Sequence, residues 1–225
     1  MASADFSAEI GAITAPSSIG RPRADVATPY ELPSQLRVAC STYNVHSSSI
    51  TCDLTPWISR HFTVQERPPP DLIIIGMQEI AMTPRSLITE ETQEGCDWGA
   101  LLLRDVNACA LRAGLSQRNC TPSSYLCLVS RQLVGMSLYV FVSQVAHTFI
   151  ASATTASLPL GALSVLGNKG AVEARLLIGS FSLQFINCHL VPHPPNLDKR
   201  NEQVHAIIII IIILIIIIII ANIAT

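Results

Sequence analysis

The chain has 225 residues, of which 49% are apolar, 13% are charged and 5% are aromatic. This length suits one or two domains, and the composition excludes a disordered, collagen-like or coiled-coil chain. The formal net charge is −2, so no overall field draws the protein to nucleic acid, and an anionic ligand has to be held by a local cluster of side chains.

The seven cysteines indicate a reducing compartment rather than a disulfide scaffold. Their number is odd, and no two of them are spaced as Cys-x-x-Cys, which argues against zinc and thioredoxin-like motifs. We therefore expect buried free thiols and a cytoplasmic protein.

The first 35 residues are rich in Ala, Ser and Pro. Asp5 and Glu9 interrupt them, so they contain no apolar core of a secretory signal. We expect residues 1–35 to form a poorly ordered leader.

Ordered structure is predicted to begin at Leu36, where apolar and small residues alternate. After three prolines, the continuous apolar run from Leu72 to Ile75 indicates a strand that is covered on both faces. In all, we expect strands at residues 36–44, 71–80, 123–134, 136–146, 171–178 and 180–190, a helix over 85–115, a loop over 151–166 and the start of a helix over 197–207. Strands outnumber helices, which predicts an α/β sandwich around largely buried sheets.

Polar residues follow three of these apolar strands. Asn44, Glu79 and His189 each come at a strand end, where a nearly fixed backbone would present them on the rim of a sheet. One such residue is usually a solvated loop residue. Three residues at the ends of three strands favour a functional cluster.

The chemistry of these residue types suits a cation and the phosphate that it carries. Glu79 offers hard oxygen ligands, and Mg²⁺ prefers one or two carboxylates together with water and phosphate. Asn44 could orient Glu79 or fix a metal-bound water, and His189 could donate to a phosphate oxygen. The GNKG segment around Lys169 offers backbone amides and an ammonium group, although such a string also occurs in ordinary turns.

Several segments together resemble the inositol polyphosphate 5-phosphatases, which have the endonuclease/exonuclease/phosphatase fold. The matching segments keep the family's order and are STYNV (41–45), DLIIIGMQEI (71–80), RQLVGMSLYVFV (131–142), GNKGAVEARLLI (167–178), INCHLVPH (186–193) and KRN (199–201). Each motif alone is weak, but their order and spacing are specific. The resemblance covers residues 36–205 and implies a truncated four-layer α/β sandwich.

The resemblance also implies a reaction and roles for particular residues. The reaction is the Mg²⁺-dependent hydrolysis of the 5-phosphate of phosphoinositides or soluble inositol polyphosphates, at the surface of a membrane. By this resemblance, Glu79 and Asn44 would bind the metal. His189 and Asn44 would make the catalytic contact with the phosphate. The implied substrate-binding residues are Asn168, Lys169, His193, Arg200 and Asn201.

Three motifs of that family are not found in the sequence: Gly-Asp-Leu-Asn, Pro-x-Trp-Cys-Asp-Arg and a terminal Ser-Asp-His. The first carries the aspartate expected to activate water, and a general base contributes roughly 10²–10⁴-fold to a rate. We therefore expect this chain to be inactive or nearly so. The alternatives are another phosphodiesterase of the same fold, such as a nuclease or sphingomyelinase, and a non-catalytic fragment that binds anionic lipid or a partner.

Residues 206–225 form a low-complexity tail, in which 207–220 are all Ile except Leu214. A helix that crosses a membrane usually needs about 20 apolar residues, so we do not expect this run to do so. It is also too long for one buried strand, although its composition suits β-aggregation. We favour the translation of a simple nucleotide repeat.

Overall fold

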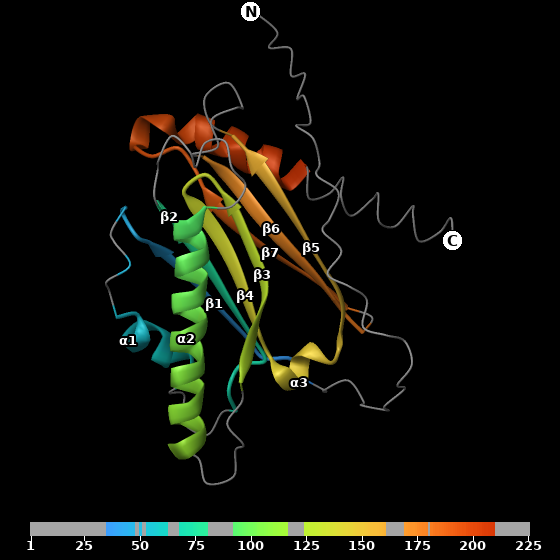
Figure 1. The fold of residues 1–225 in the computed structure, drawn as a ribbon. Coiled ribbons are helices and arrows are strands. Elements are labelled where there is room, and N and C mark those ends of the chain that lie inside the picture. Colours follow the sequence, from blue (N-terminus) through green and yellow to red (C-terminus); the bar gives the residue numbers. More distant parts are fainter. Residues whose placement is uncertain are drawn as a thin grey trace, which may run out of the picture.

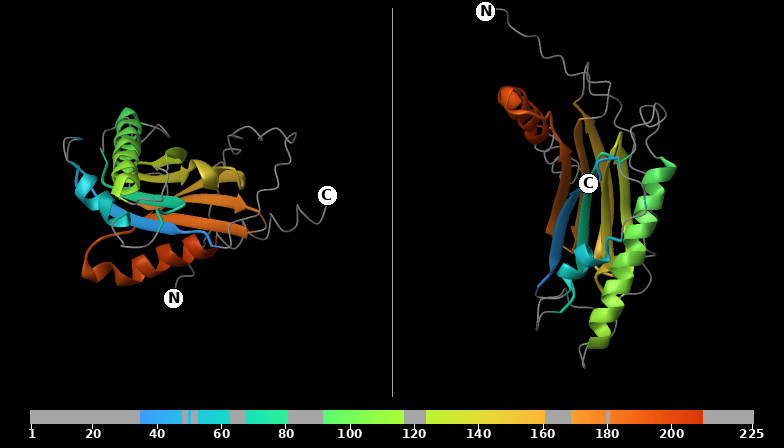
Figure 2. Two further views of the ribbon diagram at one scale, coloured as in Figure 1. Left: turned by 90° about the horizontal axis from the view of Figure 1, so that it is seen from below. Right: turned by 90° about the vertical axis from the view of Figure 1, so that its left-hand side faces the viewer.

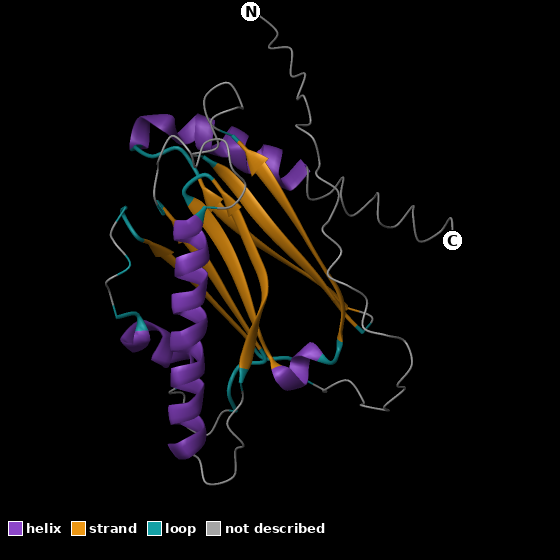
Figure 3. Ribbon diagram, in the orientation of Figure 1, coloured by secondary structure: helices purple, strands orange, loops and turns teal. Residues whose placement is uncertain are grey.

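The structure is a computed structural model, which describes residues 35–47, 50, 53–62, 68–80, 92–116, 124–160, 169–179 and 181–209 (Figures 1 and 3). The strands are β1 (Val38–Asn44), β2 (Leu72–Gln78), β3 (Tyr125–Leu133), β4 (Met136–Ser143), β5 (Ile150–Pro159), β6 (Gly170–Ile178) and β7 (Phe181–His189). The helices are α1 (Thr55–Ile58), α2 (Gln93–Ser116), α3 (Gln144–His147), the short 3₁₀ turns η1 (Ser59–His61) and η3 (Pro194–Asn196), and residues 197–209.

The strands form two sheets that stack face to face. The four-stranded sheet has the order β1-β2-β4-β3, with β1 parallel to β2, and the three-stranded sheet has the antiparallel order β5-β6-β7. Every residue of β2 is buried, as its continuous apolar run predicts. Its side chains alternate between two cores, with Ile73 and Ile75 in one and Leu72 and Ile74 in the other.

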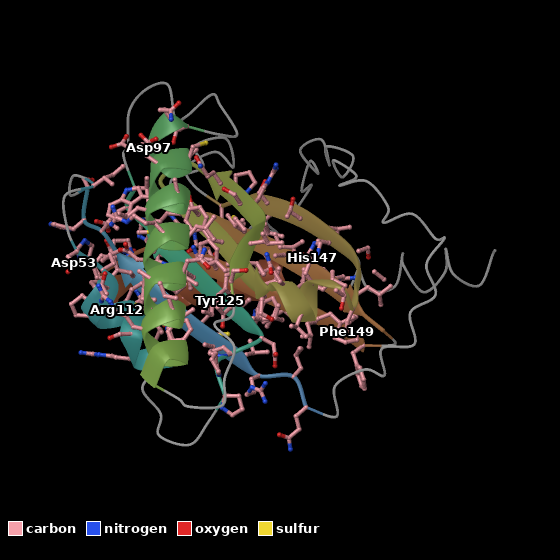
Figure 4. All side chains as sticks on the ribbon, turned by 60° about the horizontal axis from the view of Figure 1, so that its bottom comes forward. Asp53, Asp97, Arg112, Tyr125, His147 and Phe149 are labelled. Atoms are coloured by element: carbon pink, nitrogen blue, oxygen red, sulfur yellow. The ribbon has the colours of Figure 1, made fainter. Side chains whose placement is uncertain are left out.

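The first core lies between the four-stranded sheet and α2, which runs along its outer face (Figure 1). Trp98, Leu102 and Val106 recur at helical spacing on α2, and each is almost completely buried. Tyr125, at the start of β3, lies beside α2 and donates its hydroxyl hydrogen bond to the carbonyl oxygen of Pro70 (Figure 4). Packing of this apolar helix stripe therefore fixes the first layer on the sheet.

The second core lies between the two sheets, where residues of β2 and β4 meet Val172, Ala174 and Leu176 of β6. Outside the three-stranded sheet, on the side away from α2, lies the helix of residues 197–209 (Figure 2). Gln203 anchors this helix, because its side chain accepts from the Val191 amide and donates to the Leu160 carbonyl. The layers are thus helix, sheet, sheet, helix, and the predicted α/β sandwich is confirmed.

One predicted element is wrong, and the strand expected over 136–146 ends at Ser143, where α3 begins. Residues 151–166 were expected to form a loop because they are mostly Ala, Ser and Thr, yet β5 occupies Ile150–Pro159. Each residue of this strand from Ser152 onward has a register partner on β6, so antiparallel pairing imposes the extended conformation that the composition alone does not specify. The predicted helix over 85–115 appears as α2, and residues 85–91 lie outside the described part.

The expectation of buried free thiols is only half right. The cysteines of the described part are free, but of these only Cys109 is buried, whereas Cys40, Cys96, Cys127 and Cys188 are exposed. The predicted leader, apart from its last residue Gln35, and residues 210–225 of the tail lie outside the described part. Within it, Ile207 is buried at the end of the last helix, and no helix there has the length and hydropathy needed to span a membrane.

Candidate active site

The topology of the sheets brings the polar strand ends together. Asn44 closes β1 and is the register partner of Gln78, the last residue of β2, so Glu79 follows directly beside it. His189 closes β7 and is the register partner of Gly170, so Lys169 lies next to it at the start of β6. Two strand ends from each sheet therefore meet at one rim of the sandwich.

Glu79 is the acidic centre of this rim. Its Oε2 lies 3.1 Å from His46 Nδ1, and its Oε1 lies 3.7 Å from His189 Nε2. The hydrogen bond from the Asn44 side chain, followed by that from His46, holds the pKa of Glu79 below its usual value, and either imidazole lowers it further when protonated. Its side chain is 29% exposed, so the ionised carboxylate can still be reached from solvent.

The backbone of Glu79 is also unusual. Its φ is 58°, in the left-handed region that residues with side chains rarely adopt. Strained residues of this kind persist only where the surrounding structure holds them in place. They are found most often at functional sites. Here Ile80 donates from its amide to the Gly135 carbonyl, and Ser47 donates from its amide to the Glu79 carbonyl, so hydrogen bonds fix the chain on both sides.

His189 and Lys169 form the basic side of the rim. The Lys169 Nζ lies 2.9 Å from His189 Nε2, and the imidazole is only 15% exposed. Burial and the neighbouring ammonium lower the pKa of His189, and burial also lowers the pKa of Lys169. Because an ammonium group only donates, this geometry suits a neutral imidazole that accepts from Lys169.

A buried polar network beneath the rim joins the two sheets. Asn187 of β7 accepts from Gln78 Nε2 at 2.6 Å and donates to the carbonyl oxygens of Met77 and Ser137, each at 2.9 Å. Gln78 in turn bonds the Thr42 hydroxyl on β1. These bonds tie the last residues of β7 to β2 and β4, and so set the distance between His189 and Glu79.

Two glycines permit the close approach of these strands. A Cβ at Gly76 would lie 2.6 Å from Asn187 Oδ1, so only glycine leaves room for this side chain between the sheets. A Cβ at Gly170 would lie 2.1 Å from the Leu158 carbonyl oxygen on β5. The second glycine of GNKG is thus required by strand pairing, and it places Lys169 at the rim.

The structure places the predicted site residues in two groups. Asn44, Glu79, Lys169 and His189 come together, whereas Asn168 lies outside the described residues. His193 and Arg200 bond each other in the stretch between β7 and the last helix, where Arg200 Nη1 donates to the His193 carbonyl oxygen at 2.6 Å. Asn201 is exposed on the helix of residues 197–209.

Sequence reasoning missed His46 and Asn187, and it noted Gln78 beside Glu79 without giving it a role of its own. His46 follows Asn44 by two residues but reaches Glu79 only because the chain turns, with positive φ at His46 and Ser47. Asn187 precedes His189 by two residues on one strand, and such residues share a face of the sheet, which was the available signal.

The oxygen donors at the rim suit a hard divalent cation that keeps part of its water shell. Glu79 offers a carboxylate, and Asn44 offers a side-chain oxygen that accepts from the His46 amide. Within the described ranges, no group of three or more His, Cys, Asp and Glu side chains is arranged to enclose a metal. An open site with a single carboxylate fits Mg²⁺ or Ca²⁺ better than zinc.

Comparisons with known proteins agree with this geometry. The family model for the endonuclease/exonuclease/phosphatase family 2 matches residues 41–213. Polyphosphatidylinositol phosphatase INP53 of Saccharomyces cerevisiae is 26% identical over 176 residues, which cover 78% of this chain and 14% of the yeast protein. Inositol polyphosphate 5-phosphatase K of Mus musculus is 28% identical over 173 residues, which cover 77% of this chain and 33% of the mouse protein.

A solved structure is similar as well. The inositol polyphosphate 5-phosphatase domain of SPsynaptojanin, in complex with inositol (1,4)-bisphosphate and calcium ion, superposes with a TM-score of 0.54 and 26% identity. The match covers 75% of this chain and 44% of that domain, so this chain spans less than half the length of each of these relatives. The resemblance indicated by the sequence motifs is confirmed, and the chain belongs to the endonuclease/exonuclease/phosphatase family 2.

Proposed function

We propose that the rim of Asn44, Glu79, Lys169 and His189 is the metal and phosphate site of an inositol polyphosphate 5-phosphatase. The observation that carries the proposal is the convergence of these four side chains, because it sets oxygen donors for a cation beside nitrogen donors for an anion. The relatives support the substrate class, since they are named as phosphatases of inositol lipids and inositol phosphates, and the solved relative holds inositol (1,4)-bisphosphate.

Glu79 and Asn44 are the residues that we expect to hold the cation, which we propose to be Mg²⁺. When bound there, a divalent cation would polarise the phosphate and stabilise the charge that develops on it. The role of Asn44 is double, because its hydrogen bond also keeps Glu79 ionised and oriented. His46 supports the other carboxylate oxygen in the same way.

Lys169 and His189 are the residues that we expect to contact the phosphate. The Lys169 ammonium supplies a positive charge and spare donors to phosphate oxygens, since only one of its hydrogens is needed for His189. His189 accepts from Lys169 at Nε2, so its donor to a phosphate oxygen would be Nδ1–H, on a ring held in place by Lys169 and by the strand beneath it. We further propose that Asn168, His193, Arg200 and Asn201 extend this pocket toward other phosphates of the substrate.

The sequence as given is expected to turn over substrate slowly, because the aspartate motif that would activate water is not among its residues. We propose that the substrate is a phosphoinositide or a soluble inositol polyphosphate, and that the protein is cytoplasmic and peripheral to membranes. A soluble inositol phosphate nevertheless presents the same phosphate chemistry and is the simpler probe.

The test is a comparison of binding and turnover. Wild-type chain and Glu79→Ala are incubated with inositol (1,4,5)-trisphosphate and Mg²⁺, and phosphate release and binding are both measured. We expect Mg²⁺-dependent binding that the variant loses, with turnover far below that of a complete 5-phosphatase domain. Binding that is independent of Mg²⁺ and unchanged in Glu79→Ala would favour a non-catalytic anion-binding protein instead.

A further inference from the structure

The turn that follows β1 brings an imidazole to the rim. Val45 donates from its amide to the Gln78 carbonyl oxygen at 2.9 Å. Ser47 then donates from its amide to the Glu79 carbonyl oxygen, also at 2.9 Å. His46 lies between these two anchors and is held directly beside Glu79, with its Nδ1 at 3.1 Å from Glu79 Oε2.

The backbone of this turn is strained. Four residues other than glycine have a positive φ in the described part of the chain, and three of them meet here. Their φ angles are 50° at His46, 55° at Ser47 and 58° at Glu79. Such conformations are uncommon for residues with side chains, and they are found most often where a site requires them.

The contact between His46 and Glu79 contributes little to the folding of the protein. The His46 side chain is 92% exposed, and the Glu79 side chain is 29% exposed. A polar contact at such exposure stabilises a protein only slightly, and by less than strained backbone costs. The turn therefore has a geometry that stability does not explain and that a ligand at the rim would.

The atoms brought together by the turn have the spacing of ligands around one metal ion. Neighbouring ligands of an octahedral ion, with bonds of about 2.1 Å, lie about 3 Å apart. His46 Nδ1 and Glu79 Oε2 are 3.1 Å apart. The Asn44 side chain joins both residues, since its oxygen accepts from the His46 amide at 2.9 Å and it also hydrogen-bonds the Glu79 carboxylate.

The Nδ1 atom of His46 is able to act as a ligand. A neutral imidazole can carry its proton on Nε2, which leaves the lone pair of Nδ1 free for a metal ion. Because the ring is almost fully exposed, it can turn from the carboxylate toward an ion held beside it.

The second imidazole of the rim is engaged elsewhere. His189 Nε2 lies 3.7 Å from Glu79 Oε1 but only 2.9 Å from Lys169 Nζ, from which it accepts. A metal ion at that nitrogen would have to replace the ammonium and would be repelled by it. The nitrogen donor available to the cation site is therefore His46.

A nitrogen donor changes which cations a site prefers. Mg²⁺ prefers oxygen ligands and water. Imidazole instead favours transition-metal ions, whose affinities rise from Mn²⁺ through Co²⁺ to Ni²⁺. One carboxylate, one amide oxygen and one imidazole together distinguish these ions from Mg²⁺ in a way that Glu79 and Asn44 alone do not.

We propose that His46 is a third metal ligand, through Nδ1, and that the site which takes Mg²⁺ also binds a transition-metal ion such as Mn²⁺ or Co²⁺, and binds it more tightly. The inference rests on the metal site proposed above and adds to it the residue that selects the cation. Glu79 and Asn44 hold either ion, whereas His46 joins them when the ion accepts nitrogen.

The experiment compares Co²⁺ with Mg²⁺ in wild type and His46→Gln. Each ion is titrated into the full chain near neutral pH by calorimetry, and the absorption spectrum of bound Co²⁺ is recorded. Glutamine can still donate a hydrogen bond to Glu79 but offers no imidazole nitrogen. We expect the selectivity for Co²⁺ over Mg²⁺ to fall at least about tenfold in the variant, and the spectrum to change because a nitrogen ligand is lost.

His147→Gln is the matched control. His147 is an exposed histidine on α3, which follows the end of β4 away from the rim (labelled in Figure 4). This variant should bind both ions as the wild type does. The exposed thiols are the same in all the proteins, so differences in Co²⁺ binding report on the substituted histidine. Equal thermal unfolding of the two variants shows that both are folded.

Glu79→Gln separates failure of this inference from failure of the metal site. If Glu79→Gln binds both ions as the wild type does, the proposed metal site is wrong and the inference is wrong with it. If Glu79→Gln loses both ions while His46→Gln keeps the wild-type selectivity and spectrum, the metal site stands and only the inference is overturned. A wild-type chain that binds Co²⁺ no more tightly than Mg²⁺ would also overturn the inference.

Discussion

His189 lies between a cation and an anion, and this placement determines the chemistry of the rim. Lys169 Nζ lies 2.9 Å from its Nε2, and Glu79 Oε1 lies 3.7 Å from the same nitrogen. Burial and Lys169 keep the pKa of His189 low, while Glu79 opposes them. The imidazole therefore tends to be neutral near pH 7 and leaves the positive charge of the site on Lys169.

Removal of that charge tests the role of Lys169. Lys169→Met keeps the length of the side chain but loses a charged hydrogen-bond donor to phosphate, which contributes about 1.5–3 kcal/mol. We expect the Kd for inositol (1,4)-bisphosphate to rise by about 10- to 100-fold, as measured by calorimetry. Arg112→Met, which removes an exposed charge on α2, is the control and should leave the Kd unchanged. Equal affinity of both variants would contradict the assignment.

A second histidine, His61, should make the free energy of unfolding depend on pH. His61 lies away from the rim, with Nε2 at 2.8 Å from the Ser41 hydroxyl, and burial lowers its pKa. Because the unfolded chain then binds the proton more readily than the folded chain, protonation favours unfolding. The free energy of unfolding should be highest above about pH 6.5 and fall below it.

Urea unfolding of wild type and His61→Gln at about pH 7.5 and about pH 5.5 checks this sign. We expect the loss of stability toward the lower pH to be smaller in the variant, since glutamine does not titrate. His189 has a lowered pKa too and is present in both proteins, so the difference between them isolates His61. An identical loss in both proteins would show that His61 protonates equally well in the folded state.

The sequence indicated Asn44, Glu79 and His189 because each stands at the end of a predicted strand, and it indicated Lys169 through the GNKG segment. It gave no role to Asn187, although Asn187 shares a strand face with His189, because its contact with Gly76 depends on how the two sheets stack and the sequence does not show that stacking. It also missed His46, whose contact with Glu79 depends on two consecutive residues with positive φ. Local patterns thus indicated the strand ends but not the contacts between sheets.

At the scale of the elements, α2 shows how one apolar stripe positions a whole sheet. Leu102 on its buried side is 0% exposed, whereas Leu111 on the same helix is 51% exposed. The periodicity of α2 was visible in the sequence because helices carry a local repeat. β5 was not visible, since its Ser, Thr and Ala residues acquire a strand conformation only by pairing with β6.

This contrast between two leucines on one helix gives a stability test. Leu102→Ala creates a cavity against the four-stranded sheet and should lower the free energy of unfolding by about 2–5 kcal/mol. Leu111→Ala, the same substitution at an exposed site, should change it by about 0.5 kcal/mol or less. Urea denaturation of both variants gives the two values, and similar values would show that α2 is not packed as described.

At the scale of the whole molecule, the rim depends on the stacking of the two sheets. Asn44 and Glu79 belong to one sheet, and Lys169 and His189 belong to the other. The network of Asn187 and Gln78 fixes one sheet against the other directly beneath them. The fold class could be predicted from the number of apolar strands, but this pairing between sheets could not.

The most direct test of the central claim is a calorimetric titration of Mg²⁺ into the chain in the presence of inositol (1,4)-bisphosphate. The rim as described requires the carboxylate of Glu79, so Glu79→Gln should weaken Mg²⁺ binding at least about tenfold while the protein stays folded. Glu94→Gln, at the start of α2, should bind Mg²⁺ as the wild type does. Equal Mg²⁺ affinity in wild type and Glu79→Gln would contradict the account.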